Sequence, residues 1–149
     1  MGGWELNGFT TFQSGLALTP GISTNTCQCG NNLARPNVTG DPRISPSARD
    51  LNHWYDISKF SVPGPYTIGN AGRGLVYGPH THNWDLNAAK TFPIPGREGM
   101  RLEFRAEFYN LFNTPQFSDP NMTVNAGTAG RITGSRNERQ GQMALKLYF

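Results

Sequence analysis

Charged residues and long apolar runs are both scarce in this chain of 149 residues. Asp, Glu, Lys and Arg make up 15% of the sequence, against roughly 25% in an average soluble domain. No apolar run approaches the roughly 18 residues of a membrane-spanning helix, and the mean hydropathy is −0.51. These numbers do not exclude a transmembrane strand, which needs only about 9–11 residues and hides its apolar face in alternation.

Motifs for nucleic acids, phosphates and nucleophilic catalysis are also missing. The net charge of +3 comes from 13 basic and 10 acidic residues. No Lys/Arg run stands out, so we expect no nucleic-acid partner. There is neither a phosphate-binding loop nor a dinucleotide motif, and Ser14 follows Gln13 instead of the Gly of a nucleophile elbow. We therefore expect no cofactor, and the sequence leans away from an enzyme.

Cysteine and histidine are too few to make a clear metal site. Cys27 and Cys29 are separated by one residue, whereas zinc and redox motifs space their cysteines by two or more. The pair is therefore either a small loop disulfide or two free thiols. His80 and His82, with Asp85, resemble half of a metal site. A structural site needs four ligands, so we expect no bound metal.

The first residues also lack the features of a secretory signal. Met1-Gly2-Gly3-Trp4 contains neither a basic region nor an apolar signal core. Export therefore requires a signal upstream in a longer parent, and the chain expressed alone is expected to stay in the cytoplasm.

Glycine, proline and aromatic residues are plentiful, and four segments alternate with a period of two. The 18 Gly, the 11 Pro and the 11% of aromatic residues favour strands and turns over helices. Residues 100–109 alternate most strictly, which predicts a strand with one apolar and one charged face. Its apolar positions are Met100, Leu102, Phe104, Ala106 and Phe108, and its charged positions are Arg101, Glu103, Arg105 and Glu107.

Three further strands are predicted over residues 4–13, 82–92 and 141–149. In the first, Phe9 falls on the polar side and breaks the alternation. In the second, Lys90 falls on the apolar side, which suggests that it lies near an interface to which it can extend. The third places Met143, Leu145, Leu147 and Phe149 on one face.

The connections between these strands differ greatly in length. Residues 93–99 form a short Pro/Gly turn, whereas residues 14–81 and 114–140 are long and are expected to lack regular structure. With strands that alternate in direction, both long connections fall at one end of the sheet. Short turns at one end and long loops at the other are typical of outer-membrane barrels. A soluble sheet with one buried face has the same alternation.

Several motifs, in order along the chain, carry a family resemblance. They include Gly3-Trp4-Glu5-Leu6-Asn7-Gly8, Arg35-Pro36-Asn37-Val38-Thr39-Gly40, Asn83-Trp84-Asp85-Leu86-Asn87, Gly130-Arg131-Ile132-Thr133 and, most specific of all, Phe104-Arg105-Ala106-Glu107-Phe108-Tyr109-Asn110-Leu111-Phe112-Asn113. This ordered set resembles the C-terminal barrel region of TonB-dependent receptors. The closest group is the large type with a carboxypeptidase-regulatory-like N-terminal domain, common in soil bacteria such as Acidobacteria.

The resemblance implies that residues 1–149 are the C-terminal part of such a barrel in the bacterial outer membrane, with no plug domain and no signal peptide. About four strands, of the roughly 22 in a transporter of this kind, are expected to transport nothing alone. Lipid, the barrel assembly machinery and other copies at unpaired strand edges are the implied partners. The implied residue roles are a charged lumen-facing row with cross-strand pairs (Arg101, Glu103, Arg105 and Glu107) and a C-terminal assembly signal (Met143, Leu145, Leu147, Tyr148 and Phe149).

Two alternatives remain open at this stage. One is a small soluble β-rich module that binds a carbohydrate or a peptide. It would use exposed aromatic side chains in the first long connection, namely Trp54, Tyr55, Tyr66 and Tyr77. The other, less favoured, is a small metal-dependent hydrolase centred on His80, His82 and Asp85.

Overall fold

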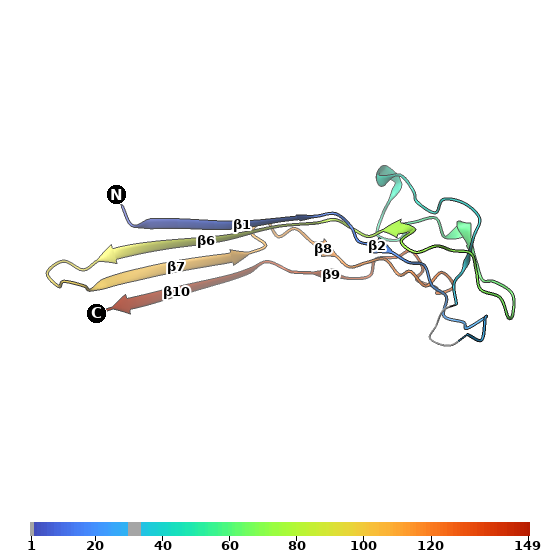
Figure 1. Ribbon diagram of the computed structural model, residues 1–149. Coiled ribbons are helices and arrows are strands. Elements are labelled where there is room, and N and C mark those ends of the chain that lie inside the picture. Colours follow the sequence, from blue (N-terminus) through green and yellow to red (C-terminus); the bar gives the residue numbers. More distant parts are fainter. Residues whose placement is uncertain (1, 30–33) are drawn as a thin grey trace. The chain divides into compact units, whose positions relative to one another are not determined.

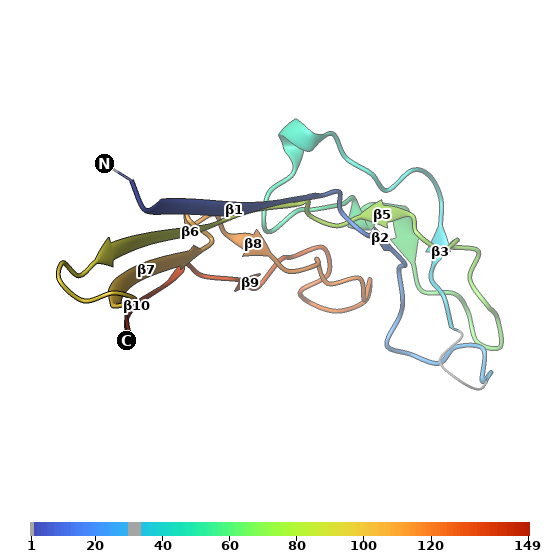
Figure 2. The same cartoon turned by 60° about the vertical axis from the view of Figure 1, so that its left-hand side comes forward.

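A computed structural model describes residues 2–29 and 34–149, and its long strands form one antiparallel sheet. The strand order is β1-β6-β7-β10, and both views show the four strands side by side (Figures 1 and 2). The prediction of an all-β chain with about four antiparallel strands is confirmed. The bounds of these strands are Trp4–Gln13 (β1), Thr81–Pro93 (β6), Arg101–Tyr109 (β7) and Gln140–Tyr148 (β10).

The register of the sheet keeps the alternation of all four strands in phase. Leu6 faces Ala88, Ala88 faces Ala106, and Ala106 faces Met143. The next row contains Asn7, Asn87, Glu107 and Gln142. Directly opposite residues of antiparallel strands share a side of the sheet. The sheet therefore has one apolar face and one polar face, each continuous over the four strands.

The two ends of the sheet are joined differently. At one end, residues 94–100 connect β6 to β7, and Gly96 and Gly99 take the positive φ values of 81° and 85° that this tight turn requires. At the other end Gln13 faces Thr81, and Tyr109 faces Gln140. Both long connections therefore leave the sheet from this second end, as the alternating strand directions predict.

The long connections are not structureless, so that part of the prediction is wrong. Their described residues form three pairs of short strands and two 3₁₀ helices. No helix in this described part of the chain is long and apolar enough to cross a membrane. The pairs are β2 (Ala17–Leu18) with β5 (Val76–Tyr77), β3 (Asn37–Val38) with β4 (Phe60–Ser61) and β8 (Gln116–Phe117) with β9 (Ser135–Arg136), and the helices are η1 (Pro46–Ala48) and η2 (Ile57–Lys59).

The chain divides into two compact units. The sheet unit comprises Met1–Gln13, Thr81–Gln116 and Arg136–Phe149, and the connection unit comprises Ser14–His80 and Phe117–Ser135. The connection unit has its own core, in which two segments far apart in sequence pack together. Its buried side chains include Pro20, Tyr55, Val76, Val124 and Ile132.

Candidate functional site

The apolar face of the sheet is uncovered, in contrast to the usual arrangement of a soluble sheet. Its apolar side chains are exposed on β1 and β10 and, apart from Ala106, at least partly exposed on β6 and β7. Leu6 is 67% exposed and Met143 is 70% exposed. Of the apolar side chains that the structure describes in the sheet unit, only Ala106 is buried. A soluble antiparallel sheet packs its apolar face against a core. Within this unit nothing covers that face.

Aromatic side chains mark both ends of the apolar face. Near the β6–β7 turn, the Lys90 Nζ atom lies 5.2 Å from the centre of the Trp4 ring and 5.5 Å from that of Phe92. Lys90 therefore extends towards the sheet end, as its place on the apolar face suggests. At the opposite end the ring of Trp84 packs edge-on against Phe12 and Phe112, with 5.9 Å between ring centres in each pair.

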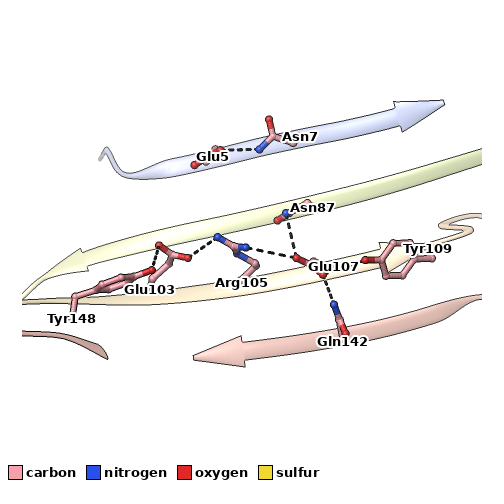
Figure 3. A network of polar contacts seen from close by, with 9 residues as sticks. All are labelled: Glu5, Asn7, Asn87, Glu103, Arg105, Glu107, Tyr109, Gln142 and Tyr148. Atoms are coloured by element: carbon pink, nitrogen blue, oxygen red, sulfur yellow. Dashed lines mark hydrogen bonds and ion pairs between the residues drawn. The ribbon is translucent and has the colours of Figure 1, made fainter. Parts of the chain in front are cut away.

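The polar face carries a connected set of hydrogen bonds and ion pairs centred on β7 (Figure 3). Arg105 contacts Glu103 at 3.0 Å and Glu107 at 3.9 Å. Glu107 also accepts hydrogen bonds from the side chains of Asn87 on β6 and Gln142 on β10. Glu103 and Glu107 are mostly covered, with side chains 15% and 19% exposed. The two carboxylates on the central strand β7 are therefore largely covered by polar neighbours.

The geometry of this polar network differs in one respect from the expected cross-strand ion pairs. Among the described residues of this face, the two ion pairs run along β7 itself, and the links between strands are hydrogen bonds. Arg101, at the end of β7, places its guanidinium carbon 4.3 Å from the centre of the Tyr148 ring on β10. The network ties three strands together.

Asp85 and Asn110 organise the end of the sheet from which the long connections leave. The Asp85 Oδ1 atom accepts hydrogen bonds from the Asn83 side chain at 2.8 Å and from the Asn110 backbone at 2.9 Å. Asn110 is 2% exposed, and its side-chain Nδ2 atom donates to the carbonyl oxygens of Thr114 and Asn137. Its φ of 52° turns the chain sharply after β7.

The buried role of Asn110 was not predicted from the sequence. Two asparagines at the strand end, Asn110 and Asn113, were part of the most specific motif and both adopt φ values of 52°. Asparagine is the non-glycine residue that tolerates this region best, because its short side chain bonds to the local backbone. An Asn directly after a strongly alternating strand was the feature of the sequence that could have indicated this sharp turn.

The structure does not bring the three residues of the hydrolase alternative together. His82 and Asp85 are three residues apart on β6, so they lie on opposite faces of the sheet. His80 belongs to the connection unit. Among residues 2–29 and 34–149 there is no group of three or more His, Cys, Asp or Glu that could hold a metal ion. A metal-dependent hydrolase at these positions is therefore not supported.

The four aromatic residues proposed for a soluble binding module have different environments. Tyr55 is fully buried and donates a hydrogen bond to the Asn121 carbonyl at 2.9 Å, so the expectation that it is exposed is wrong. Burial raises the pKa of its phenol to about 12. Trp54 and Tyr77 line a cavity of about 430 Å³ in the connection unit, whereas Tyr66 is exposed elsewhere.

The connection unit also contains a disulfide and an exposed ion pair. Cys27 and Cys29 form a disulfide, one of the two states that their spacing left open. Asp41 and Arg43 form an exposed pair with a nitrogen–oxygen distance of 2.8 Å. The hydrogen bonds from Arg43 lower the pKa of the Asp41 carboxyl to about 2.

The residues expected to act as an assembly signal lie on and beside β10. Met143, Leu145 and Leu147 share the exposed apolar face, whereas Tyr148 lies on the polar face, where its hydroxyl donates to Glu103 at 3.5 Å. Phe149 follows the strand and is exposed. β10 pairs with β7 on one side only, so it is an edge strand of this sheet.

Comparison with known proteins gives one family match. Residues 1–142 match the family model described as "Outer membrane beta barrel domain". No curated protein and no solved structure matches the chain.

Proposed function

This chain belongs to the family of outer membrane beta barrel domains, and we propose that it forms part of the barrel of a TonB-dependent receptor. In this arrangement the apolar face of the sheet contacts lipid. The polar face, with Arg101, Glu103, Arg105 and Glu107, lines the interior. The family match supports the outer membrane as the location and gives no support to the cytoplasmic alternative.

The observation that carries this proposal is the uncovered apolar face of the sheet. Its apolar side chains are exposed on β1 and β10 and, apart from Ala106, at least partly exposed on β6 and β7. The carboxylates of Glu103 and Glu107 are largely covered by polar neighbours. When the sheet lies in a bilayer, the side chains of its apolar face contact lipid hydrocarbon instead of water. The charged side chains then face a polar interior, where they retain their hydrogen bonds.

The dimensions of the apolar face also fit a bilayer. Trp4 and Phe12 are eight positions apart on β1, which at about 3.3 Å per residue and a tilt of about 40° is roughly 20 Å along the membrane normal. An outer-membrane barrel has an apolar band about 25 Å tall between two aromatic girdles. The Trp4–Phe92 end and the Phe12–Trp84–Phe112 cluster would form these girdles.

Four strands are too few to close a barrel, so the sheet needs neighbours. The smallest barrels have about eight strands, and here β1 and β10 each pair on one side only. Further strands of a longer parent would continue the sheet at both edges. Without them, the same edges would favour pairing with a second copy.

The connection unit then corresponds to the extracellular side. Both long connections leave the sheet at the end opposite the β6–β7 turn, and barrels of this class place long loops outside and short turns in the periplasm. The Cys27–Cys29 disulfide agrees with this side, because disulfides persist in oxidising compartments and at cell surfaces.

The assembly machinery is the proposed partner of β10. Met143, Leu145 and Leu147 present an apolar row beside an open strand edge. A strand of this kind can be recognised by β-augmentation, in which the backbone pairs and the alternating side chains specify the partner.

The specific assignment to a TonB-dependent receptor has a direct test. Antibodies against the chain should isolate a native outer-membrane protein much larger than the 16.4 kDa of residues 1–149. In that preparation, cross-linking should capture TonB, and the protein in planar bilayers should conduct little because a plug fills the barrel. A protein that forms a constantly open pore and yields no TonB cross-link would contradict the assignment and indicate a porin.

A further inference from the structure

The disulfide of the connection unit closes a very short loop. It joins Cys27 to Cys29, so the only residue between the two cysteines is Gln28. In the chain-entropy model a disulfide stabilises a fold less when it encloses fewer residues, because it then removes fewer conformations from the unfolded chain. A bond between positions two apart restricts the unfolded chain only slightly. Stabilisation of the fold therefore does not account for this disulfide.

The chain just before the disulfide is held in place by other contacts. The Tyr66 amide donates a hydrogen bond to the Thr26 carbonyl at 2.7 Å, and the Thr26 hydroxyl donates to the Thr67 carbonyl at 3.2 Å. These bonds hold residues 24–29 against residues 64–68 whether the disulfide is closed or open. Opening it is therefore compatible with the folded connection unit.

The backbone at Gln28 opposes the closed loop. Gln28 has a φ of 51°, in the left-handed region where the Cβ atom of a residue other than glycine lies too close to the following carbonyl oxygen. Asn and Asp offset this cost with short side chains that bond to the local backbone, whereas the side chain of glutamine is longer. When the disulfide opens, Gln28 can return to a negative φ. Opening the loop therefore relieves an unfavourable conformation.

The disulfide can also be reached from solvent. Cys27 and Cys29 are partly exposed, and Gln28 between them is exposed. Residues 24–29 and 64–68 contain no Asp or Glu, so neither segment repels an approaching thiolate. Disulfides that are exposed or strained are reduced more readily than buried structural ones. This bond combines exposure with an unfavourable loop, so it has the properties of an exchangeable disulfide.

The two sulfur atoms differ in their polar contacts. The Cys29 backbone N–H donates to the Cys27 Sγ atom at 3.4 Å, and the Asn25 Oδ1 atom lies 3.4 Å from the same sulfur. Within residues 2–29 and 34–149 no hydrogen bond reaches the Cys29 sulfur. A donated N–H stabilises negative charge on a thiolate, and a better stabilised thiolate leaves faster. Cys27 is therefore the leaving group, and the Cys29 sulfur is the one that is attacked.

We propose that the Cys27–Cys29 disulfide is a thiol-exchange site at which a low-molecular-weight thiol becomes covalently attached to Cys29. The incoming thiolate attacks the Cys29 Sγ atom and forms a new sulfur–sulfur bond. The bond between the two cysteines breaks, and its electron pair leaves with the Cys27 sulfur as a thiolate. This thiolate takes up a proton from water and can then donate it to the Asn25 Oδ1 atom.

A second molecule of the same thiol completes the reduction. Its thiolate attacks the sulfur of the attached thiol, which leaves Cys29 as a thiolate and releases the two thiol molecules joined by a disulfide. The thiol is therefore oxidised and the pair of cysteines is reduced. The inference goes beyond the proposed function, because it concerns only groups of the connection unit.

The test is incubation of the full oxidised chain, folded in detergent micelles, with glutathione as the probe thiol. Early acid quenching and mass spectrometry of the peptides should locate the attached glutathione mainly on Cys29. Gln28→Gly should lower the equilibrium constant for reduction about fivefold, because glycine adopts positive φ without strain. Gln28→Val should raise this constant, since a β-branched residue tolerates positive φ least.

Two controls separate this chemistry from general effects on the fold. Asn137→Gly removes another positive φ, of 57°, outside the disulfide loop, and it should leave the reduction equilibrium unchanged. The double variant Cys27→Ser with Cys29→Ser should take up no glutathione. It should also unfold at the same urea concentration as the wild type, because the short loop contributes little to stability.

Other outcomes overturn the proposal. A disulfide that resists glutathione until urea unfolds the chain would be structural, and a clear loss of stability in the double serine variant would show the same. Attachment to Cys27 as often as to Cys29 would contradict the assigned leaving group. Equal effects of Gln28→Gly and Asn137→Gly would contradict the role of the Gln28 backbone. None of these results depends on whether the apolar face of the sheet contacts lipid, so the proposed function stands or fails separately.

Discussion

Replacing Asn110 with alanine should unfold the end of the sheet from which the long connections leave. The Asn110 side chain is buried and makes three hydrogen bonds. It donates to the Asn137 carbonyl at 2.5 Å and to the Thr114 carbonyl at 2.9 Å, and it accepts from the Thr114 amide at 2.9 Å. At about 1 kcal/mol for each bond, alanine loses about 3 kcal/mol. A further cost of about 1 kcal/mol arises because alanine tolerates a φ of 52° poorly.

Asn113 provides a control with the same backbone conformation. Its φ is also 52°, but its side chain is exposed and accepts one hydrogen bond, from the Arg139 amide at 3.2 Å. Asn113→Ala should therefore cost about 2 kcal/mol less than Asn110→Ala, since two fewer hydrogen bonds are lost. Asn110→Gly should recover about 1 kcal/mol relative to Asn110→Ala, because glycine adopts positive φ without strain.

The assay is urea unfolding of the chain in detergent micelles, followed by far-UV circular dichroism and extrapolated to water. The expected order of stability is wild type, Asn113→Ala, Asn110→Gly and Asn110→Ala. Equal destabilisation by the two alanine variants would refute the assignment of Asn110 as the buried anchor of this sheet end.

Three further predictions concern single groups. The pKa of Asp41 should rise from about 2 towards its usual value near 4 in Arg43→Ala, as NMR titration will show. In the wild type the stability from the Asp41–Arg43 pair is present above pH 4 and is lost as the pH falls towards 2. An unchanged pKa of Asp41 in Arg43→Ala would contradict this pairing. The Tyr55 phenol should ionise near pH 12 in a spectrophotometric titration. The stability that its neutral form contributes is therefore present below pH 10 and is lost as the pH rises towards 12. Ionisation at pH 10 would show that the phenol is not buried. Leu145→Asp should reduce assembly of the parent protein into the outer membrane, as measured by resistance to urea extraction, because it places a charge on the lipid face. Ala144→Asp, its neighbour on the polar face, should have little effect, and equal losses would contradict the assigned faces.

The sheet could be predicted from the sequence because its information is local. Residues 100–109 alternate strictly, and the structure places β7 at Arg101–Tyr109. Neighbouring strands alternate in the same way, and short Pro/Gly turns indicate where the chain reverses. The position of Lys90 on the apolar face also predicted its extension towards the sheet end.

The connection unit could not be predicted in this way, because its core is built from contacts between distant segments. Tyr55 is fully buried beside Gly130 and the ring of Phe60, and it donates a hydrogen bond to the carbonyl oxygen of Asn121. No periodic pattern surrounds Tyr55, so its sequence neighbourhood reads as an exposed loop. Distance in sequence therefore explains why a core residue was predicted to be a ligand-facing aromatic.

The polar face of the sheet contains a residue, Phe9, whose meaning depends on the register. Phe9 breaks an alternation, and in the sequence this only weakens the prediction of a strand. Once Phe9 is placed opposite Asp85, with Asn87 in the next row, the same irregularity becomes an exposed aromatic ring on the polar face of the sheet. Pairing between strands far apart in sequence was needed to see this.

The orientation of the apolar face towards lipid is tested most directly by tryptophan quenching with brominated lipids. Three single-tryptophan variants, each keeping one of Trp4, Trp84 and Trp54 and replacing the others with phenylalanine, are reconstituted in vesicles. Trp4 and Trp84 lie on the apolar face of the sheet, whereas Trp54 lies in the connection unit and donates its Nε1 hydrogen bond to the Tyr77 carbonyl at 2.8 Å. Brominated acyl chains should quench Trp4 and Trp84 strongly and leave Trp54 unchanged. Equal emission of all three tryptophans with and without bromine would contradict the membrane-facing orientation of the sheet.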